Sequence, residues 1–142
     1  MMSLEENKAL MRQLTEEFIN KGNLDAADDF FAADFINHNP RPGMTPDLEG
    51  LKQYVSMMRS AFPDLRIEEV DVIAEGDKVV GMGTAIGTHK GDFGGIPPTD
   101  KQITVSVISI IRIAGGKVVE RWNITDQLSM LQQLGILPTP GQ

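Results

Sequence analysis

Five side chains in this sequence could together carry chemistry on a small molecule. Asp126, His38 and His89 are able to move protons, while Asn37 and Trp122 could bind and enclose a substrate. A carboxylate in an apolar cavity is disfavoured in its charged form, so it becomes a better base than in water. Histidine can donate a hydrogen bond to the negative charge that develops on a substrate oxygen. The set therefore favours acid–base chemistry on a small molecule.

Asp126 has two interpretations. It follows a strand-like segment that contains Trp122 and precedes a helix-like segment, a position at which aspartate commonly caps a helix. Asn123 or Thr125 could supply that cap equally well. In an unbulged strand, Trp122 and Asp126 have the same parity and would point to the same face. We favour the base over the cap, and both remain open at this point.

The other polar candidates also have structural explanations. Asn37 and His38 precede "NPRPG" and can serve simply to end a helix. His89 can be a solvated residue at the end of a strand. His38 and His89 are far apart in the sequence and lack the i, i+4 spacing that fixes two ligands on one face. No metal site is therefore predicted.

The familiar motifs for nucleotides and covalent nucleophiles do not fit. The run "GMGTAIG" has the wrong glycine spacing for a dinucleotide site and is part of a predicted strand. There is no P-loop, and no serine stands in a nucleophile elbow. The lysines fall on expected polar faces, strand ends or turns, where an amine is not desolvated. The sequence thus shows neither a nucleotide-binding motif nor an activated covalent nucleophile.

Length and charge indicate one acidic domain spanning residues 1–142. The chain has 20 Asp and Glu against 13 Lys and Arg, a net charge of −7, and no cysteine. Such a charge repels nucleic-acid phosphates and anionic membrane surfaces. The start "MMSLEENKAL" does not have the pattern of a signal peptide. We therefore expect a cytoplasmic protein with neither a nucleic-acid nor a membrane partner.

Periodicity divides the chain into an N-terminal helical part and a strand part. Caps and i, i+4 spacing predict three helices, over residues 3–22, 24–35 and 45–62. Runs rich in Val, Ile and Thr predict four strands, over residues 65–75, 78–90, 101–113 and 117–125. A short helix that ends at Gly135 and a frayed tail over residues 138–142 complete the chain.

These elements predict an α+β fold. Short turns join the strands, so they form an antiparallel meander of four or more strands. A curved sheet with three N-terminal helices across its concave side makes a cone with a blind pocket. The run "ITVSVISIIRI" is apolar at both parities over part of its length, so the outer sheet face needs a cover. A homodimer through the sheet is the expected solution, with higher assembly left open.

Three stretches carry a resemblance to a known family: "DFINHNP", "GTHKGDFGGIPPTDKQITV" and "IIRIAGGKVVERWNITDQLSMLQQLG". Together they resemble the SnoaL-like polyketide cyclases of the nuclear transport factor 2-like superfamily. The resemblance covers nearly the whole chain and implies an α+β cone. The sequence departs from the family pattern at Asp100, where the family usually has glycine.

The resemblance also implies roles for individual residues. Asp126 matches the family's acid/base aspartate, His89 the histidine beside it, His38 a histidine at the pocket mouth, and Trp122 an aromatic of the pocket wall. The predicted substrate-binding set contains His38, Asn37, Trp122, Phe93, Tyr54 and Met58.

The implied reaction is a cyclisation that needs neither metal nor organic cofactor. A base removes a proton from a carbon between two carbonyl groups, and the enolate closes a ring within the same molecule. The expected ligand is a small hydrophobic carbonyl or polyketide-like compound. Two alternatives remain open because a fold does not fix an activity: another isomerase or hydrolase using the same pocket, and a non-catalytic binding or dimerisation module.

Overall fold

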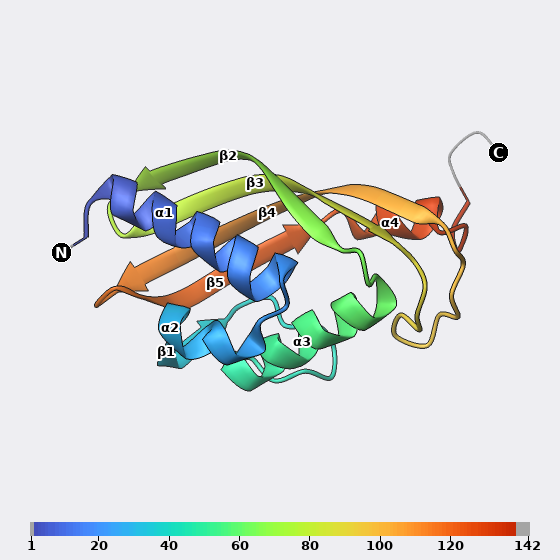
Figure 1. Ribbon diagram of the computed structural model, residues 1–142, viewed down its shortest axis with the longest axis horizontal. Helices are drawn as coiled ribbons and strands as arrows, with labels where there is room; N and C mark the ends of the chain where they lie inside the picture. Colours follow the sequence, from blue (N-terminus) through green and yellow to red (C-terminus); the bar gives the residue numbers. More distant parts are fainter. Residues whose placement is uncertain (1, 139–142) are drawn as a thin grey trace.

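The computed structural model describes residues 2–138, so the predicted tail lies outside the described residues except for Pro138. Figure 1 shows one sheet with the helices α1 and α3 lying across one of its faces. The helical elements are α1 (Leu4–Leu14), a π-helical segment (Thr15–Asn20), a 3₁₀ turn (Leu24–Ala26), α2 (Ala27–Phe30), α3 (Leu48–Ala61) and α4 (Gln127–Gln133). The strands are β1 (Phe31–Asn37), β2 (Arg66–Glu75), β3 (Lys78–Thr88), β4 (Gln102–Ala114) and β5 (Lys117–Thr125).

The sheet has the strand order β1-β5-β4-β3-β2. The strands β2 to β5 form the expected antiparallel meander, with turns at Gly76 and at the Gly115–Gly116 pair, all three of which adopt positive φ. β1 pairs with β5 in the parallel direction, so the sheet is mixed rather than purely antiparallel. The α+β class predicted from the sequence is confirmed.

The second predicted helix is wrong over its second half. The helical backbone ends at Phe30, and Phe31 takes the extended conformation that begins β1. Phe31 and Phe35 are buried and their rings pack against each other, with Phe18 from the π-helical segment on the other side of Phe31. Pairing with the free edge of β5 outweighs the helical spacing of this segment, as tertiary contacts commonly do.

The helix ends follow the sequence signals closely. Ser3 and Glu6 form the predicted capping box at α1. The N-cap of α3 is Asp47 and not the expected Thr45. The Asp47 carboxylate accepts the backbone N–H of Gly50, so the helix begins two residues later than predicted. Gly135 adopts positive φ after α4, as the predicted helix stop requires.

Two strands contain an extra residue that changes which side chains face the helices. In β2, the pairing with β3 passes over Val70, and in β5 the pairing with β4 passes over Val119. Because side chains alternate between faces, each bulge exchanges the two faces for the residues beyond it. As a result, Glu69 of β2 and Arg121 of β5 both face the helices.

The strand β3 carries almost no large side chains on its helix-facing side. Its buried positions from the middle of the strand onward are Gly81, Gly83, Ala85 and Gly87. Across from them, the π-helical segment widens the end of α1, a feature that often accompanies functional sites. Missing side chains on one wall and a widened helix on the other leave space between the sheet and the helices.

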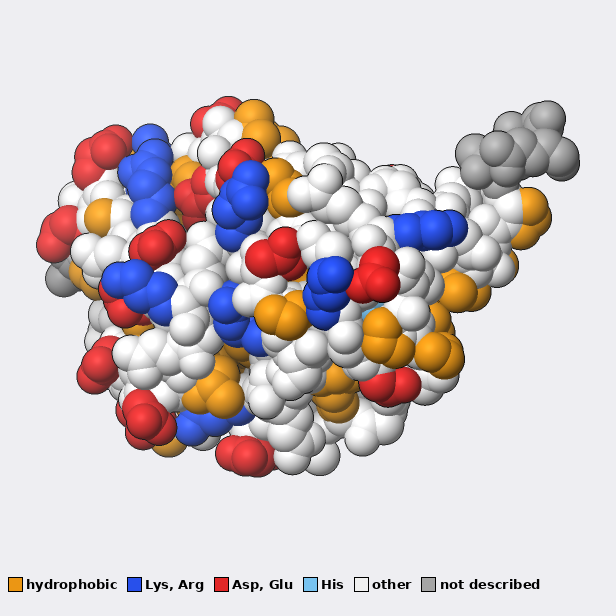
Figure 2. All heavy atoms as spheres, turned by 45° about the vertical axis from the view of Figure 1, so that its right-hand side comes forward, with side chains coloured by type: hydrophobic (Ala, Val, Ile, Leu, Met, Phe, Trp, Pro, Cys, Tyr) orange, Lys and Arg blue, Asp and Glu red, His pale blue; other side chains and the backbone are white. Residues whose placement is uncertain are grey.

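The surface on the side seen in Figure 2 is of mixed charge. Acidic and basic side chains are interspersed there, and apolar atoms lie in small groups between them. Among the described residues, none of the helices combines the length and the apolar character needed to cross a membrane.

Candidate active site

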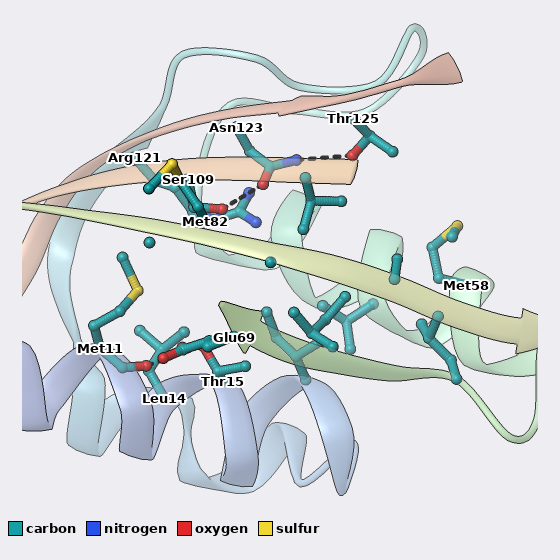
Figure 3. Close-up of a pocket in the computed structure, with 18 of the residues that line it drawn as sticks. Met11, Leu14, Thr15, Met58, Glu69, Met82, Ser109, Arg121, Asn123 and Thr125 are labelled. Carbon is teal, nitrogen blue, oxygen red and sulfur yellow. Dashed lines mark hydrogen bonds between the residues drawn. The ribbon is translucent and has the colours of Figure 1, made fainter. Parts of the chain in front are cut away.

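A pocket lies between the helix-facing side of the sheet and the helices α1 and α3. Its cavity volume is about 80 Å³. Most of its wall is apolar, and its polar lining residues are Thr15, Tyr54, Glu69, Ser109, Arg121, Asn123 and Thr125. Figure 3 shows Glu69 on the wall formed by β2 and α1, with Arg121 on the wall formed by β5.

Glu69 is the one acidic residue in this lining, counted among the described residues. Its Oε1 atom is buried and has no hydrogen-bond partner. The nearby Thr15 hydroxyl donates to the Met11 backbone carbonyl at 3.0 Å and is therefore already engaged. A buried carboxylate oxygen without a donor is unusual in a folded protein, and Asn7 Oδ1 and His89 Nε2 are the other two buried side-chain atoms without a partner among the described residues.

Arg121 is the basic residue of the pocket. It is only 6% exposed, and no carboxylate of the described residues forms an ion pair with it. Burial lowers the pKa of its guanidinium below the ordinary arginine value, because the charged form loses hydration. Its neighbours in the register are Ile111 on β4 and Asn37 on β1, so it sits in the interior of the sheet.

A chain of small polar groups runs beside Arg121. The Ser109 hydroxyl donates to the Asn123 side-chain carbonyl, and the Asn123 amide donates to the Thr125 hydroxyl at 3.4 Å (Figure 3). These bonds fix the orientation of the Asn123 amide. The pocket therefore presents oriented polar groups along one wall and apolar groups elsewhere, which is the usual composition of a small-molecule site.

An open groove adjoins the pocket and shares Tyr54, Arg121, Asn123 and Thr125 with it. The remaining groove residues are Asn37, Asn39, Pro40, Arg41, Pro42, Ile124 and Gln127. The loop after β1 is attached to β5 here, because the Asn123 backbone N–H donates to Asn39 Oδ1 at 2.9 Å. Arg121 therefore lines both the groove and the pocket.

The expected position of Asp126 inside the pocket is wrong. Its carboxylate is exposed and accepts the backbone N–H of Ser129 at 3.1 Å, which makes it the N-cap of α4. Neither the pocket nor the groove includes it. The bulge at Val119 does not move it inward, since Asp126 lies beyond the end of β5 where the chain has already turned into the helix.

Substitutions of Asp126 test its role as the cap of α4. Asp126→Ala should lower the free energy of unfolding by about 1 kcal/mol, because the Ser129 N–H loses its acceptor. Asp126→Asn should change the free energy of unfolding by only a few tenths of a kcal/mol, because asparagine caps a helix equally well. Urea denaturation of both variants measures the difference. Equal losses in the two variants would show that the carboxylate does more than cap the helix.

His89 is fully buried, but outside the pocket lining. Thr99 donates its backbone N–H to Nδ1 at 3.2 Å, so the proton of the neutral ring resides on Nε2, which has no partner. The His89 ring packs against two phenylalanines. Its centroid lies 5.3 Å from that of Phe62 and 6.3 Å from that of Phe93. The structure therefore does not bring His89 and Asp126 together in a common pocket.

Trp122 faces away from the pocket, contrary to the prediction. The bulge at Val119 places it on the outer side of the sheet, where His38 stacks on it with centroids 4.5 Å apart. His38 Nε2 lies 3.0 Å from Glu120 Oε1, and Arg112 also pairs with Glu120. The Arg112 hydrogen bond, assisted by His38, lowers the pKa of the Glu120 carboxyl. His38 and Trp122 thus belong to a polar cluster on the outer face.

The remaining predicted binding residues divide between the pocket and other places. Tyr54 and Met58 line the pocket as expected, and Asn37 lines the groove. Phe93 lies in the buried cluster around His89, with the Arg41 guanidinium 4.7 Å from its ring centroid. No group of three or more potential metal ligands occurs within residues 2–138.

Sequence reasoning missed Glu69 and Arg121. The signal for Arg121 was available, since Arg121, Asn123 and Thr125 share one parity and are all polar, while Trp122 and Ile124 share the other. That pattern is typical of a strand whose outer face is apolar and whose inner face lines a polar site. Glu69 carried no comparable signal, because adjacent glutamates at 68 and 69 fit either face.

Comparisons with known proteins identify the family. The model of the SnoaL-like polyketide cyclase family matches residues 9–134. The chain belongs to this family. Nogalonic acid methyl ester cyclase of Streptomyces nogalater is 29% identical over 118 residues, covering 82% of this chain and 88% of that protein. The aklanonic acid methyl ester cyclase DnrD of Streptomyces peucetius is 29% identical over 139 residues, covering 92% of each chain.

Solved SnoaL-like structures have the same fold. TsrD from Streptomyces laurentii superimposes with a TM-score of 0.86 at 26% identity, covering 96% of this chain and 100% of that one. A protein from Acidithiobacillus ferrooxidans gives a TM-score of 0.81 at 34% identity, covering 94% and 98%. The expected membership of the SnoaL-like family is therefore confirmed over nearly the whole chain.

Proposed function

We propose that this SnoaL-like protein is a cofactor-independent enzyme that forms an enolate from a small carbonyl substrate and uses it to close a ring. The observation that carries the proposal is the unpartnered Oε1 atom of Glu69 in a pocket that also holds Arg121. A base and a cation on different walls of one apolar pocket are the two groups that enolate formation needs. The curated relatives, named as methyl ester cyclases, support the same reaction class.

Glu69 is the proposed base. Its Oε1 atom accepts the proton from the carbon between two carbonyl groups, and the electron pair of that C–H bond becomes the enolate. The enolate carbon then forms a C–C bond with a carbonyl carbon of the same molecule. Glu69 returns its proton to the alkoxide that results. Protons and electrons balance without a metal, an oxidant or a second substrate.

Arg121 is the proposed stabiliser of the negative charge. A buried guanidinium offers two parallel N–H donors, and no carboxylate of the described residues occupies them. In a pocket with little water, such donors act more strongly than they do in solvent. The Ser109–Asn123–Thr125 chain would orient the substrate carbonyl beside them.

Deuterium uptake tests the enolate step without knowledge of the natural substrate. Ethyl 2-methylacetoacetate in D₂O, followed by proton NMR, loses its C2 proton signal when it enolises. The protein should accelerate this loss over a matched sample that contains heat-denatured protein. If the folded protein produced no acceleration at any concentration of the keto ester, the enzyme proposal would fail.

A homodimer through the outer sheet face is the proposed assembly. Register places two adjacent rows of outward apolar side chains across the sheet. One row is Ile73, Val80, Ile110 and Trp122, and the other is Met82, Ile108 and Ile124. Ile108 and Ile124 are 46% and 64% exposed, which is a large apolar surface for a monomer to leave uncovered.

A cytoplasmic location likewise stays a prediction from the sequence.

Ile108→Lys should convert the dimer into a monomer. The side chain lies between Met82 and Ile124 in its row, so a charge there would be buried in the interface of two sheets. Sedimentation velocity of the wild type and the variant measures the mass directly. Thr104→Lys, at an exposed position on the same face of β4, is the matched control and should leave the mass unchanged. A monomeric wild type would contradict the proposed assembly.

A further inference from the structure

The groove that leads to the pocket carries positive charge in an otherwise acidic protein. The chain has 20 acidic and 13 basic residues, yet the described groove lining contains Arg41 and Arg121 and neither Asp nor Glu. Arg41 lies above the ring of Phe93 and forms no ion pair with the described residues. The groove therefore favours an anionic ligand.

Arg121 stands at the junction of groove and pocket. It lines both, it is nine-tenths buried, and its side chain has no hydrogen-bond or ion-pair partner among the described residues. An uncompensated buried charge costs several kcal/mol. Sequences retain such a group where a ligand compensates it, as binding sites do when their charge is complementary to the ligand. Glu69 does not fill this role, because it forms no ion pair with Arg121.

The size of the pocket restricts what can lie beyond Arg121. A cavity of about 80 Å³ is well below the ~300 Å³ at which sites for drug-sized ligands begin. The inner space is therefore small, and a short acyl chain is the part of a ligand that suits it. Because the cavity wall beyond Arg121 is mostly apolar, the charged end of the ligand belongs at the junction and its uncharged end inside.

We propose that the ligand of this site is a short oxo-carboxylic acid, whose free carboxylate binds two of the five guanidinium N–H donors of Arg121 at the junction and leaves the others for the enolate oxygen, while its carbonyl end enters the pocket. The planar guanidinium fork matches the two oxygens of a carboxylate and gains little from a neutral ester. The claim that this ligand is the substrate depends on the proposed enolate chemistry. Its binding to Arg121 does not depend on that chemistry, so the binding proposal and the enolate proposal can fail separately.

The test compares 4-oxopentanoate with its methyl ester, which lacks the negative charge and carries one additional methyl group. Titration by NMR chemical shift should show that the wild type binds the acid at least about tenfold more tightly. Arg121→Gln should remove this preference while leaving the weak ester affinity unchanged. Arg12→Gln, on the exposed side of α1, is the matched control and should keep the full preference.

Further variants distinguish the possible outcomes. Arg121→Lys keeps the charge but loses the fork, so an intermediate preference is expected even if the glutamine variant folds poorly. Glu69→Gln should bind the acid at least as tightly as the wild type does, because Arg121 remains and a negative charge is removed from the same pocket. Equal affinity for acid and ester, a preference that survives in Arg121→Gln, or no saturable binding of either compound would overturn the proposal. Competition by inorganic phosphate as strong as that of the acid would also overturn it, in favour of a phosphate ligand.

Discussion

Glu69→Gln should slow deuterium uptake by the keto ester at least about 100-fold, the usual contribution of a positioned general base. Glutamine has nearly the same shape as glutamate, so the packing against Thr15 and Leu14 should persist. The amide cannot accept the substrate proton. Rates per folded protein, with the fold checked by circular dichroism, give the measurement.

Asp126→Asn is the matched control for this experiment. It removes a carboxylate that the sequence resemblance assigns to catalysis, while asparagine preserves the helix cap. The rate of the Asp126 variant should equal that of the wild type if Glu69 is the base. The reverse result, a full rate in Glu69→Gln and a large loss in Asp126→Asn, would restore Asp126 as the base and require α4 to move.

Arg121→Met should raise the free energy of unfolding by about 1–4 kcal/mol, the range seen when buried ion pairs are replaced by apolar groups of similar volume, because an unpaired charge has no Coulombic attraction to lose. The gain is expected because the guanidinium is desolvated and has no partner among the described residues, whereas a methionine would pack against Ile111 and Tyr54. Urea denaturation at neutral pH measures the change, with an unchanged m-value as a check on compactness.

Arg112→Met provides the comparison for this stability effect. Arg112 pairs with Glu120 on the outer face, so its removal should give no gain and leaves Glu120 with His38 alone. A loss of stability in Arg121→Met similar to that in Arg112→Met would mean that the buried guanidinium holds the fold together. A gain would instead mark Arg121 as a residue kept for binding at a cost in stability.

Local signals in the sequence were sufficient for most of the framework. The Ser3–Glu6 capping box, the glycine turns and the Val- and Ile-rich runs each determine structure within a few residues, so α1 and the strands β2 to β5 could be predicted. The strand β1 could not be predicted. Its helical spacing is real, and only the free edge of β5, which is distant in sequence, makes it extended.

The candidate site was harder to predict because it depends on two single-residue bulges. An unbulged β5 would point Trp122 inward and Arg121 outward, which is the arrangement that alternation alone suggests. The adjacent valines at 118 and 119 allow either register, so nothing local reveals the bulge. Met58 lies on the inner face of α3 that the helical spacing predicts, and both Met58 and Tyr54 line the pocket; their binding of a substrate stays a prediction.

The glycines of β3 allow substrate size and reaction chemistry to diverge independently in evolution. The atoms nearest to a Cβ at Gly81 belong to the flexible side chain of Met11, with Cε at 3.3 Å, so larger residues there could shorten the cavity. A Cβ at Gly83 would lie 2.7 Å from the backbone carbonyl oxygen of Glu68, which cannot give way so easily. Neither position bears the proposed base or the buried cation. Descendants of this chain could therefore change the length of ligand they accept through Gly81 while Glu69 and Arg121 stay as they are.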